Sequence, residues 1–209
     1  MKESFYGYAF PDGFYLEYGP RTVRFSKGEL HLGASKKGPS WLPGFFIGNL
    51  IGFAALHFLG IRPIQVEELA HRAGWTELLW ILGILALLIA ALRLLPAGQA
   101  TLRWHAVEHK VLHALENQDA DLRQASALHP ACGSVGVFFM LALLGLSLPW
   151  LPMLLAGLLS VGGAYLLHVY LPEKSPLRYP GLFFQRLLVM EPHPEQLAAG
   201  LKALQALRD

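Results

Sequence analysis

The chain has 209 residues, of which 54% are hydrophobic and 15% charged, and its formal net charge at pH 7 is +2. Since about a quarter of the residues of an average soluble domain are charged, this composition excludes an ordinary water-soluble domain and is typical of a membrane protein. We therefore predict a mainly α, integral membrane fold: about four transmembrane helices, a small N-terminal β-meander and a cytoplasmic helical cap. We expect no nucleic-acid partner.

Residues 1–40 are the first predicted segment, and we expect them to be rich in β-structure. The stretch FYLEYGPRTVRFSKGELHLG alternates apolar and polar residues, with turn signals at Gly19-Pro20 and Lys27-Gly28. Alternation interrupted by such turns is typical of short antiparallel strands. The pattern predicts a meander of two or three strands.

Three apolar stretches follow, and together they are long enough for four membrane spans. Trp41 to Gly60 and Glu77 to Pro96, in the segment 41–98, each match the roughly 20 residues that cross a hydrocarbon core. Val135 to Leu171, in the segment 134–172, is long enough for two spans and is broken by the prolines of Leu148-Pro149-Trp150-Leu151-Pro152. His168, near the end of the fourth span, is expected at the membrane interface.

The distribution of lysine and arginine predicts the topology. Six of these residues lie in residues 1–40 and five follow residue 172, against two between the first and second spans. Cytoplasmic segments carry the excess of positive charge, so both termini and the segment 99–133 are expected in the cytoplasm. Residues 1–40 contain no apolar core of signal-peptide length, so we expect no cleavable leader.

The segment RWHAVEHKVLHALE, residues 103–116, concentrates metal-ligand side chains and is expected to be one helix. At 3.6 residues per turn its histidines and acids share one broad face. His105-Ala-Val-Glu108-His109 has the H-x-x-E-H order of inverted zincins, in which both histidines bind zinc and the glutamate is a general base for water. His109, His113 and Glu116 offer a second, overlapping register. One metal at either end of the helix, or two metals, are all compatible with this pattern.

A further ligand is expected from the stretch ALHPACGS, which precedes the third span. We predict a second short helix starting at Asp119 or Asp121, whose return would bring His129 and Cys132 toward His105. Histidine and cysteine in a turn are plausible zinc ligands, and Cys132 is the single cysteine of the chain. The predicted ligands are His105, His109 and His129, with Cys132 next. His113 and Glu116 would supply outer contacts or a second metal site.

The C-terminal segment, 173–209, is expected to be cytoplasmic and to contain amphipathic helices. Pro194 to Leu207 begins with a proline and repeats leucine at helical spacing.

Three sequence blocks resemble a known family. HAVEHKVLHALE, LHPACG and YPGLFFQRLLVMEP occur in this order and are followed by QLAAGLKAL. This order resembles the YqhQ-like family of bacterial integral membrane proteins, a domain of unknown function sometimes described as predicted metal-dependent enzymes. The resemblance covers Arg103 to the C-terminus and implies a multi-pass protein of the bacterial inner membrane.

The family pattern falls on specific residues of this chain. Its H-G-A-E-H-K block resembles His105, Glu108, His109 and Lys110, and its H-P-R-C-G block resembles His129, Pro130, Cys132 and Gly133, with Ala131 replacing the arginine. Its closing block resembles Pro180, Gly181, Gln185, Glu191 and Pro192. The resemblance supplies no substrate.

Two functions follow from these residues. The first is a membrane-embedded metal-dependent hydrolase, in which a divalent metal, most readily zinc, is held by the histidines and Glu108 is the catalytic base for a lipid or membrane-peptide substrate. Phosphate esters and peptide bonds are both open, and Lys110 is either a contact to an anionic group or an exposed lysine. The alternative is a non-enzymatic scaffold for a protein partner, with a closed site of His105, His109, His129 and Cys132. Haem held between histidines is a weaker third idea.

Overall fold

The computed structural model of the protein describes residues 5–34, 75–117 and 121–208. The chain is mostly helical, with an antiparallel sheet at its N-terminus. The strands are β1 (Phe5–Phe10), β2 (Gly13–Tyr18), β3 (Arg21–Ser26) and β4 (Glu29–Ala34), paired in the order β1-β2-β3-β4. The predicted meander is confirmed, with four strands rather than two or three. The strand that the prediction missed is β1, whose sequence FYGYAF does not alternate between apolar and polar residues.

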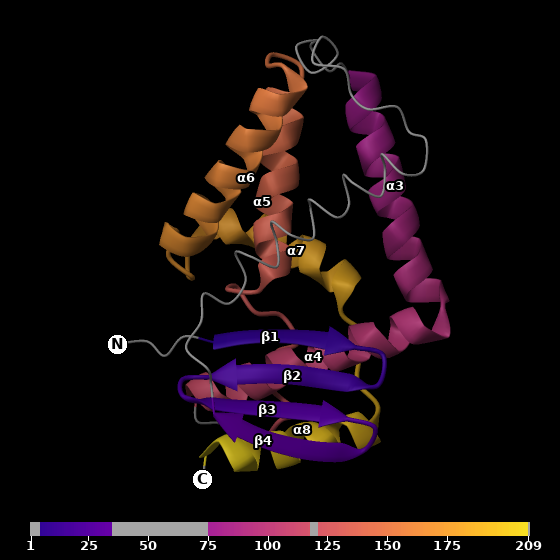
Figure 1. Ribbon diagram of the computed structural model, residues 1–209, viewed down its shortest axis with the longest axis vertical. Coiled ribbons are helices and arrows are strands. Elements are labelled where there is room, and N and C mark those ends of the chain that lie inside the picture. The colour runs from indigo at the N-terminus through magenta and orange to yellow at the C-terminus, as the bar shows by residue number, and fades with distance from the viewer. Residues whose placement is uncertain (1–4, 35–74, 118–120, 209) are drawn as a thin grey trace.

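One face of the sheet carries the largest apolar core. Phe14, Leu16, Val23 and Phe25 alternate along β2 and β3 and are buried. Trp104 packs against this face, with its ring centroid 5.8 Å from that of Phe14 and 5.2 Å from that of Phe25. The two helices that cover the sheet are α4 (Pro96–Asn117) and α8 (Pro194–Arg208) (Figure 1). This packing fixes α4, and therefore the motif of residues 103–116, against the sheet.

The remaining helices extend away from the sheet or connect back to it. They are α3 (Trp75–Leu94), α5 (Gly133–Ser147), α6 (Met153–Tyr170) and α7 (Tyr179–Gln185), with short 3₁₀ turns η1 (Pro176–Arg178) and η2 (Arg186–Leu188). The expected break between two apolar helices at residues 148–152 is confirmed, and so are the helices predicted over residues 103–116 and from Pro194. In Figure 1, α5 and α6 stand side by side above the sheet.

A sharp bend separates α3 from α4. The axes of Leu78–Leu94 and Pro96–Asn117 differ by 88°. Gly98 permits this close turn, since a Cβ at that position would overlap the backbone of Leu92. Among the described residues, no helix alone combines the length and the apolarity needed to cross a membrane; only this bent pair, taken together, meets that test. The predicted first span, residues 41–60, lies outside the described residues.

The loop before α5 differs from the expectation. Instead of a second short helix, residues 121–132 form a series of turns, while Asp119 lies outside the described residues. Asp121 accepts a hydrogen bond from the backbone N–H of Arg123 at 2.9 Å and another from the side chain of Gln124 at 3.0 Å. Such side-chain bonds to nearby backbone favour turns over helix. The loop therefore returns along α4 as irregular chain.

Candidate metal centre

The α4 motif is buried between the sheet and the loop that precedes α5. Glu108 and His109 are only 5% and 1% exposed. They lie on the helix where β1 crosses it, and α5 begins close by at Cys132. Polar groups placed at such a depth require specific partners, which makes their hydrogen bonds informative.

The two histidines of the H-x-x-E-H pattern are each oriented by a backbone carbonyl. Nδ1–H of His105 donates to the Leu188 oxygen at 2.9 Å, and Nδ1–H of His109 donates to the Ala127 oxygen at 2.7 Å. Their ring centroids are 4.3 Å apart. Each ring therefore presents Nε2, and Nε2 of His109 is buried without a hydrogen-bond partner in the described part of the chain. Orientation of one ring nitrogen by a carbonyl is usual for metal-ligating histidine.

Cys132 brings a sulfur to these nitrogens. It is the N-cap residue of α5, and its Sγ lies 3.4 Å from Nε2 of His105. The hydroxyl of Ser134 donates to the same sulfur at 3.2 Å. The ligand atoms of His105, His109 and Cys132 all lie within 4.8 Å of one another. Tetrahedral zinc with bonds of 2.0 to 2.3 Å separates its ligands by about 3.5 Å, so a small closure of this group could hold the ion.

The electrostatics couple this thiol to the imidazoles. Burial alone would raise the pKa of Cys132, but the neighbouring His109 and His105 outweigh it and hold the pKa well below its usual range. Burial would likewise lower the pKa of His105, whereas its hydrogen bond to Cys132 and the charges of Cys132 and Glu108 raise it to about 9. Without metal, a proton on His105 therefore joins the two side chains as a thiolate–imidazolium pair.

Glu108 faces the same region from α4. Burial raises its pKa to about 8, against an opposing effect of His105. Its Oε2 is buried and has no hydrogen-bond partner within the described residues. The close approach of β1 depends on Gly7, because a Cβ there would overlap the Glu108 carboxylate. A desolvated carboxyl with a free oxygen is suited to accept and return a proton.

His129, a predicted ligand, is not brought into this group. Its Nε2 lies 3.0 Å from Oε2 of Glu116, and its Nδ1 accepts the Ala131 backbone N–H at 3.3 Å. His113 donates from Nε2 to the Leu128 oxygen at 2.6 Å, and its ring meets that of His129 edge-on. The second register, His113 and Glu116, therefore binds the loop before α5. Cys132 takes the third position in the cluster.

The remaining family-motif positions differ in their roles. Gln185 is fully buried, accepts the His129 backbone N–H at 2.9 Å and donates to the Ser134 hydroxyl at 3.0 Å. Gly133 begins α5, and Glu191 is exposed outside the cluster. The expectation of an exposed Lys110 was wrong: it is 4% exposed, and its ammonium donates to the Arg123 and Ala125 carbonyls at 3.0 and 2.8 Å. It anchors the loop, and it is not among the residues that line the cavity described below.

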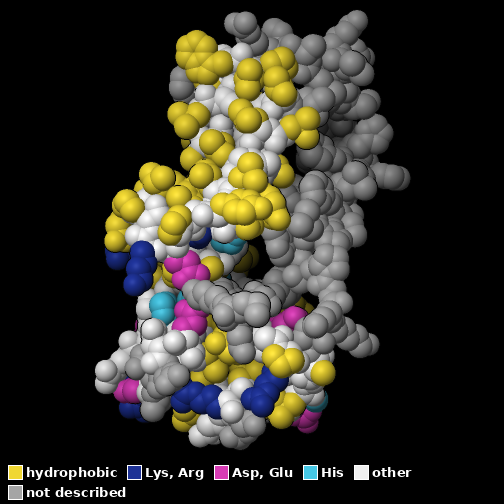
Figure 2. All heavy atoms as spheres, turned by 90° about the vertical axis from the view of Figure 1, so that its left-hand side faces the viewer, with side chains coloured by type: hydrophobic (Ala, Val, Ile, Leu, Met, Phe, Trp, Pro, Cys, Tyr) yellow, Lys and Arg dark blue, Asp and Glu magenta, His cyan; other side chains and the backbone are white. Residues whose placement is uncertain are grey.

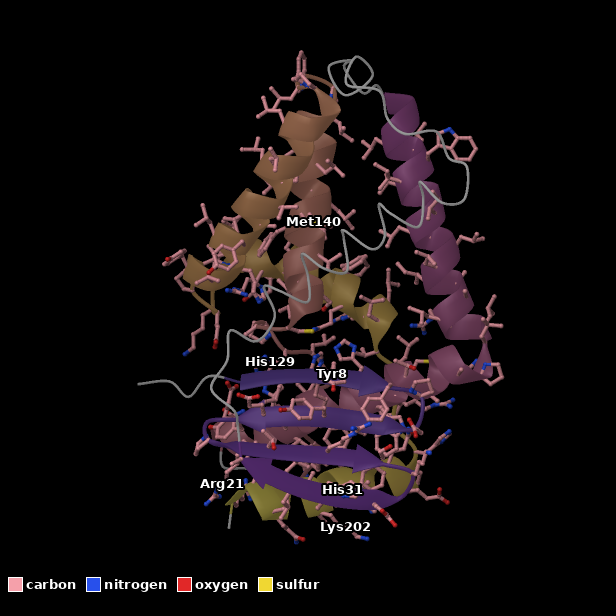
Figure 3. All side chains as sticks on the ribbon, viewed as in Figure 1. Tyr8, Arg21, His31, His129, Met140 and Lys202 are labelled. Atoms are coloured by element: carbon pink, nitrogen blue, oxygen red, sulfur yellow. The ribbon has the colours of Figure 1, made fainter. Side chains whose placement is uncertain are left out.

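A cavity of about 650 Å³ opens beside the cluster, between β1, α4, α5 and α6. His105, Glu108, His109 and Cys132 line one end of it. In Figure 3, Tyr8 and His129 lie at the level of β1 and Met140 lies above them on α5; all three line the cavity.

Two residues that sequence reasoning did not place in the site support it. His168 of α6 lines the cavity, and its Nδ1 is buried with no hydrogen-bond partner among the described residues. Arg178 is 2% exposed and donates to the carbonyls of His168 and Pro130, which joins the end of α6 to the loop beside Cys132. The only sequence signal for His168 was its polarity within an apolar helix. That signal fits a residue at the membrane interface as well as one that lines a cavity.

Comparisons with protein-family models, with curated proteins and with solved structures find no match for this chain. The resemblance to the YqhQ-like family stays a prediction.

Proposed function

We propose that the protein is a membrane-bound, zinc-dependent hydrolase whose active site faces the cytoplasm. One observation carries the proposal: three potential ligand atoms, from His105, His109 and Cys132, converge at the wall of a cavity that Glu108 also lines. Catalytic zinc sites use three protein ligands and leave one position open, whereas structural sites use four. His129, the fourth ligand of a closed site, is instead bonded to Glu116. The geometry therefore supports the hydrolase better than a scaffold with a structural metal.

The residues divide the chemistry among them. His105, His109 and Cys132 would hold zinc, which supplies Lewis acidity and lowers the pKa of water. Glu108 would accept a proton from the attacking water at its unpaired Oε2 and return it to the leaving group. The carbonyls of Leu188 and Ala127 keep both imidazoles in the tautomer that leaves Nε2 free.

We place the protein in the bacterial inner membrane because of its apolar helices, and both termini in the cytoplasm because lysine and arginine gather near the two ends of the chain. α3, α5 and α6 expose large hydrophobic side chains: Leu79, Trp80, Leu87, Leu88, Leu146, Leu158, Leu159 and Leu166. Figure 2 shows hydrophobic side chains gathered over the upper half of the molecule, while charged side chains lie in the lower half. An apolar surface of this extent is too large for a typical monomer in water, and a lipid bilayer is the partner that covers it best.

The contact between Cys132 and His105 favours a second candidate, a metal-free thiol hydrolase. A thiolate at a helix N-terminus, 3.4 Å from an imidazole nitrogen, is the arrangement of an activated nucleophile. Here Cys132 would attack the substrate carbonyl and His105 would give a proton to the leaving group. Both candidates act on the same kind of bond, and they differ in whether metal is required.

Metal analysis and a glutamate variant test the proposal. The detergent-purified protein is expected to contain one zinc per chain. X-ray absorption should show one sulfur and three nitrogen or oxygen ligands, with the outer-shell scattering of two imidazoles. Glu108→Gln should keep the zinc and lower turnover of a model ester by 10² to 10⁴-fold. Glu116→Gln, a matched change at the other end of α4, should lower it less than threefold.

Two other outcomes would decide against zinc catalysis. Activity that survives complete removal of metal by a chelator and disappears on alkylation of Cys132 would establish the thiol candidate. A site with three imidazoles and one sulfur, or a Glu108→Gln variant with full activity, would refute catalysis by zinc and Glu108.

A further inference from the structure

The cavity beside the metal centre has a composition that distinguishes between substrate classes. No lysine or arginine lines it among the described residues, and Glu108 is its one carboxylate there. Phosphate esters carry negative charge, and proteins bind them with Arg, Lys or helix N-termini. The one helix N-terminus on the described lining is that of α5, and the sulfur of Cys132 already stands at its N-cap. The nearest lysine of the motif, Lys110, is occupied by two carbonyls of the loop. The lining therefore favours an uncharged reacting group.

The part of the cavity away from the cluster is apolar and lies between α5 and α6. Val137 and Met140 line it from α5, and Val161 and Ala164 line it from α6. The same helices expose leucines on their outer surface, including Leu146 and Leu158. A long apolar chain could pass from that surface to the cavity without burying a polar backbone, which a peptide substrate would have to do.

Building on the proposed hydrolase, we propose that the cavity binds the acyl chain of an uncharged membrane amphiphile and presents its ester carbonyl to His105, His109 and Cys132. The volume of about 650 Å³ lies within the 300 to 1,000 Å³ of small-molecule sites. Polar atoms stand at the end where the ester would lie: Oε2 of Glu108 and Nδ1 of His168 are both buried without a partner in the described part of the chain.

The reaction that follows is hydrolysis of the acyl ester. Water adds to the acyl carbon, the bond between that carbon and the ester oxygen breaks, and Glu108 transfers the proton from water to the departing alcohol. The products are a fatty acid and an alcohol, and no oxidant or reductant is required.

Two glycines of α6 provide a matched pair of variants. No described atom lies within 4 Å of a Cβ built on Gly162 or on Gly157. Gly162 lines the cavity and Gly157 does not. Leucine at either position removes a helix-destabilising glycine, so both variants should fold. Only Gly162→Leu places a side chain in the path of the acyl chain.

The test maps where an uncharged acyl chain binds to the full-length protein in detergent. A fatty amide with a diazirine midway along its chain is photolysed, and its attachment sites are located by mass spectrometry. Attachment is expected at the cavity walls around Met140 and Val161, at least fivefold above the outer surface of α3. Gly162→Leu should reduce cavity attachment at least fivefold, and Gly157→Leu should leave it unchanged.

Hydrolysis by the zinc-loaded protein is then measured with p-nitrophenyl esters of four and sixteen carbons. The ratio of long-chain to short-chain turnover should fall at least tenfold in Gly162→Leu and stay unchanged in Gly157→Leu. Cavity attachment without turnover of either ester would refute the hydrolase and leave the acyl-chain site standing. Attachment confined to the outer surface, or the same attachment in both glycine variants, would overturn the acyl-chain site whatever the turnover; cleavage of apolar peptides would then point to a peptide substrate.

Discussion

At the N-terminal end of the α4 motif, His105 and His109 present Nε2 toward Cys132, whereas at the C-terminal end His113 and Glu116 are bonded to the loop that returns along the helix. The residue types at the two ends are nearly the same. The difference comes from which ring nitrogen donates to a backbone carbonyl. In His105 and His109 it is Nδ1, so that Nε2 faces the cluster, whereas in His113 it is Nε2. One end is thereby available for chemistry, and the other holds the fold together.

Replacing one histidine at each end of the α4 motif tests this difference most directly. His109→Gln removes a proposed ligand, and we expect zinc affinity to fall at least 100-fold, which is about 2.7 kcal/mol. His113→Gln should change affinity less than threefold, because its amide can donate to the Leu128 carbonyl in place of the ring. Isothermal titration of zinc into metal-free protein measures both. Equal losses would show that the two ends are not functionally distinct.

Substitution of Lys110 tests how strongly α4 anchors the loop that precedes α5. Its ammonium donates to the carbonyls of Arg123 and Ala125, of which the second bond is buried, so Lys110→Met leaves both carbonyls without this donor. We expect the free energy of unfolding to fall by about 2 to 3 kcal/mol. Lys174→Met, at an exposed position, should change it by less than about 0.5 kcal/mol. Urea unfolding in detergent compares them, and a Lys110→Met variant as stable as the control would contradict the anchoring role.

The pH dependence of zinc binding tests whether His105 is a metal ligand. The ligand form of His105 is neutral, but its pKa is raised to about 9 by Cys132 and Glu108 against the effect of burial. Below pH 9 zinc must displace this proton, so affinity should fall by up to tenfold, about 1.4 kcal/mol, for each unit between pH 9 and pH 7. Competition with a chelator across this range measures the slope. A flat profile would mean that His105 does not bind the metal.

Glu108 should affect the stability of the metal-free protein in a pH-dependent way. The pKa of Glu108 in the folded protein, about 8, lies above the ordinary value of 4.5. Its contribution to the free energy of unfolding is therefore fully present below pH 4.5 and is lost as the pH rises through 8. Glutamine does not ionise and avoids this loss. Glu108→Gln should therefore be more stable than the wild type by up to about 4 kcal/mol at pH 8, with the difference shrinking to about 1 kcal/mol near pH 5. Urea unfolding at both pH values checks this, and a variant that is less stable at pH 8 would argue against a desolvated carboxyl.

The sequence by itself determined the local features of this protein. Alternation predicted the strands of residues 14–33, and the prolines at 149 and 152 predicted the break between α5 and α6. The spacing of His105, Glu108 and His109 placed them on one side of a helix, because helical angles depend only on residue number. These features need no knowledge of the rest of the chain.

Which of these groups lie together depends on the tertiary structure. The sequence favoured His129 over Cys132 as the third ligand, but Sγ of Cys132 meets His105 across 27 residues, and the carbonyl that orients His105 comes from 83 residues away. Lys110 is buried because the loop before α5 covers it, and His168 lines the cavity because α6 packs beside α5. Both contacts are distant in sequence. Such contacts are set by how α4, α5 and the loop pack, and no local spacing encodes that packing.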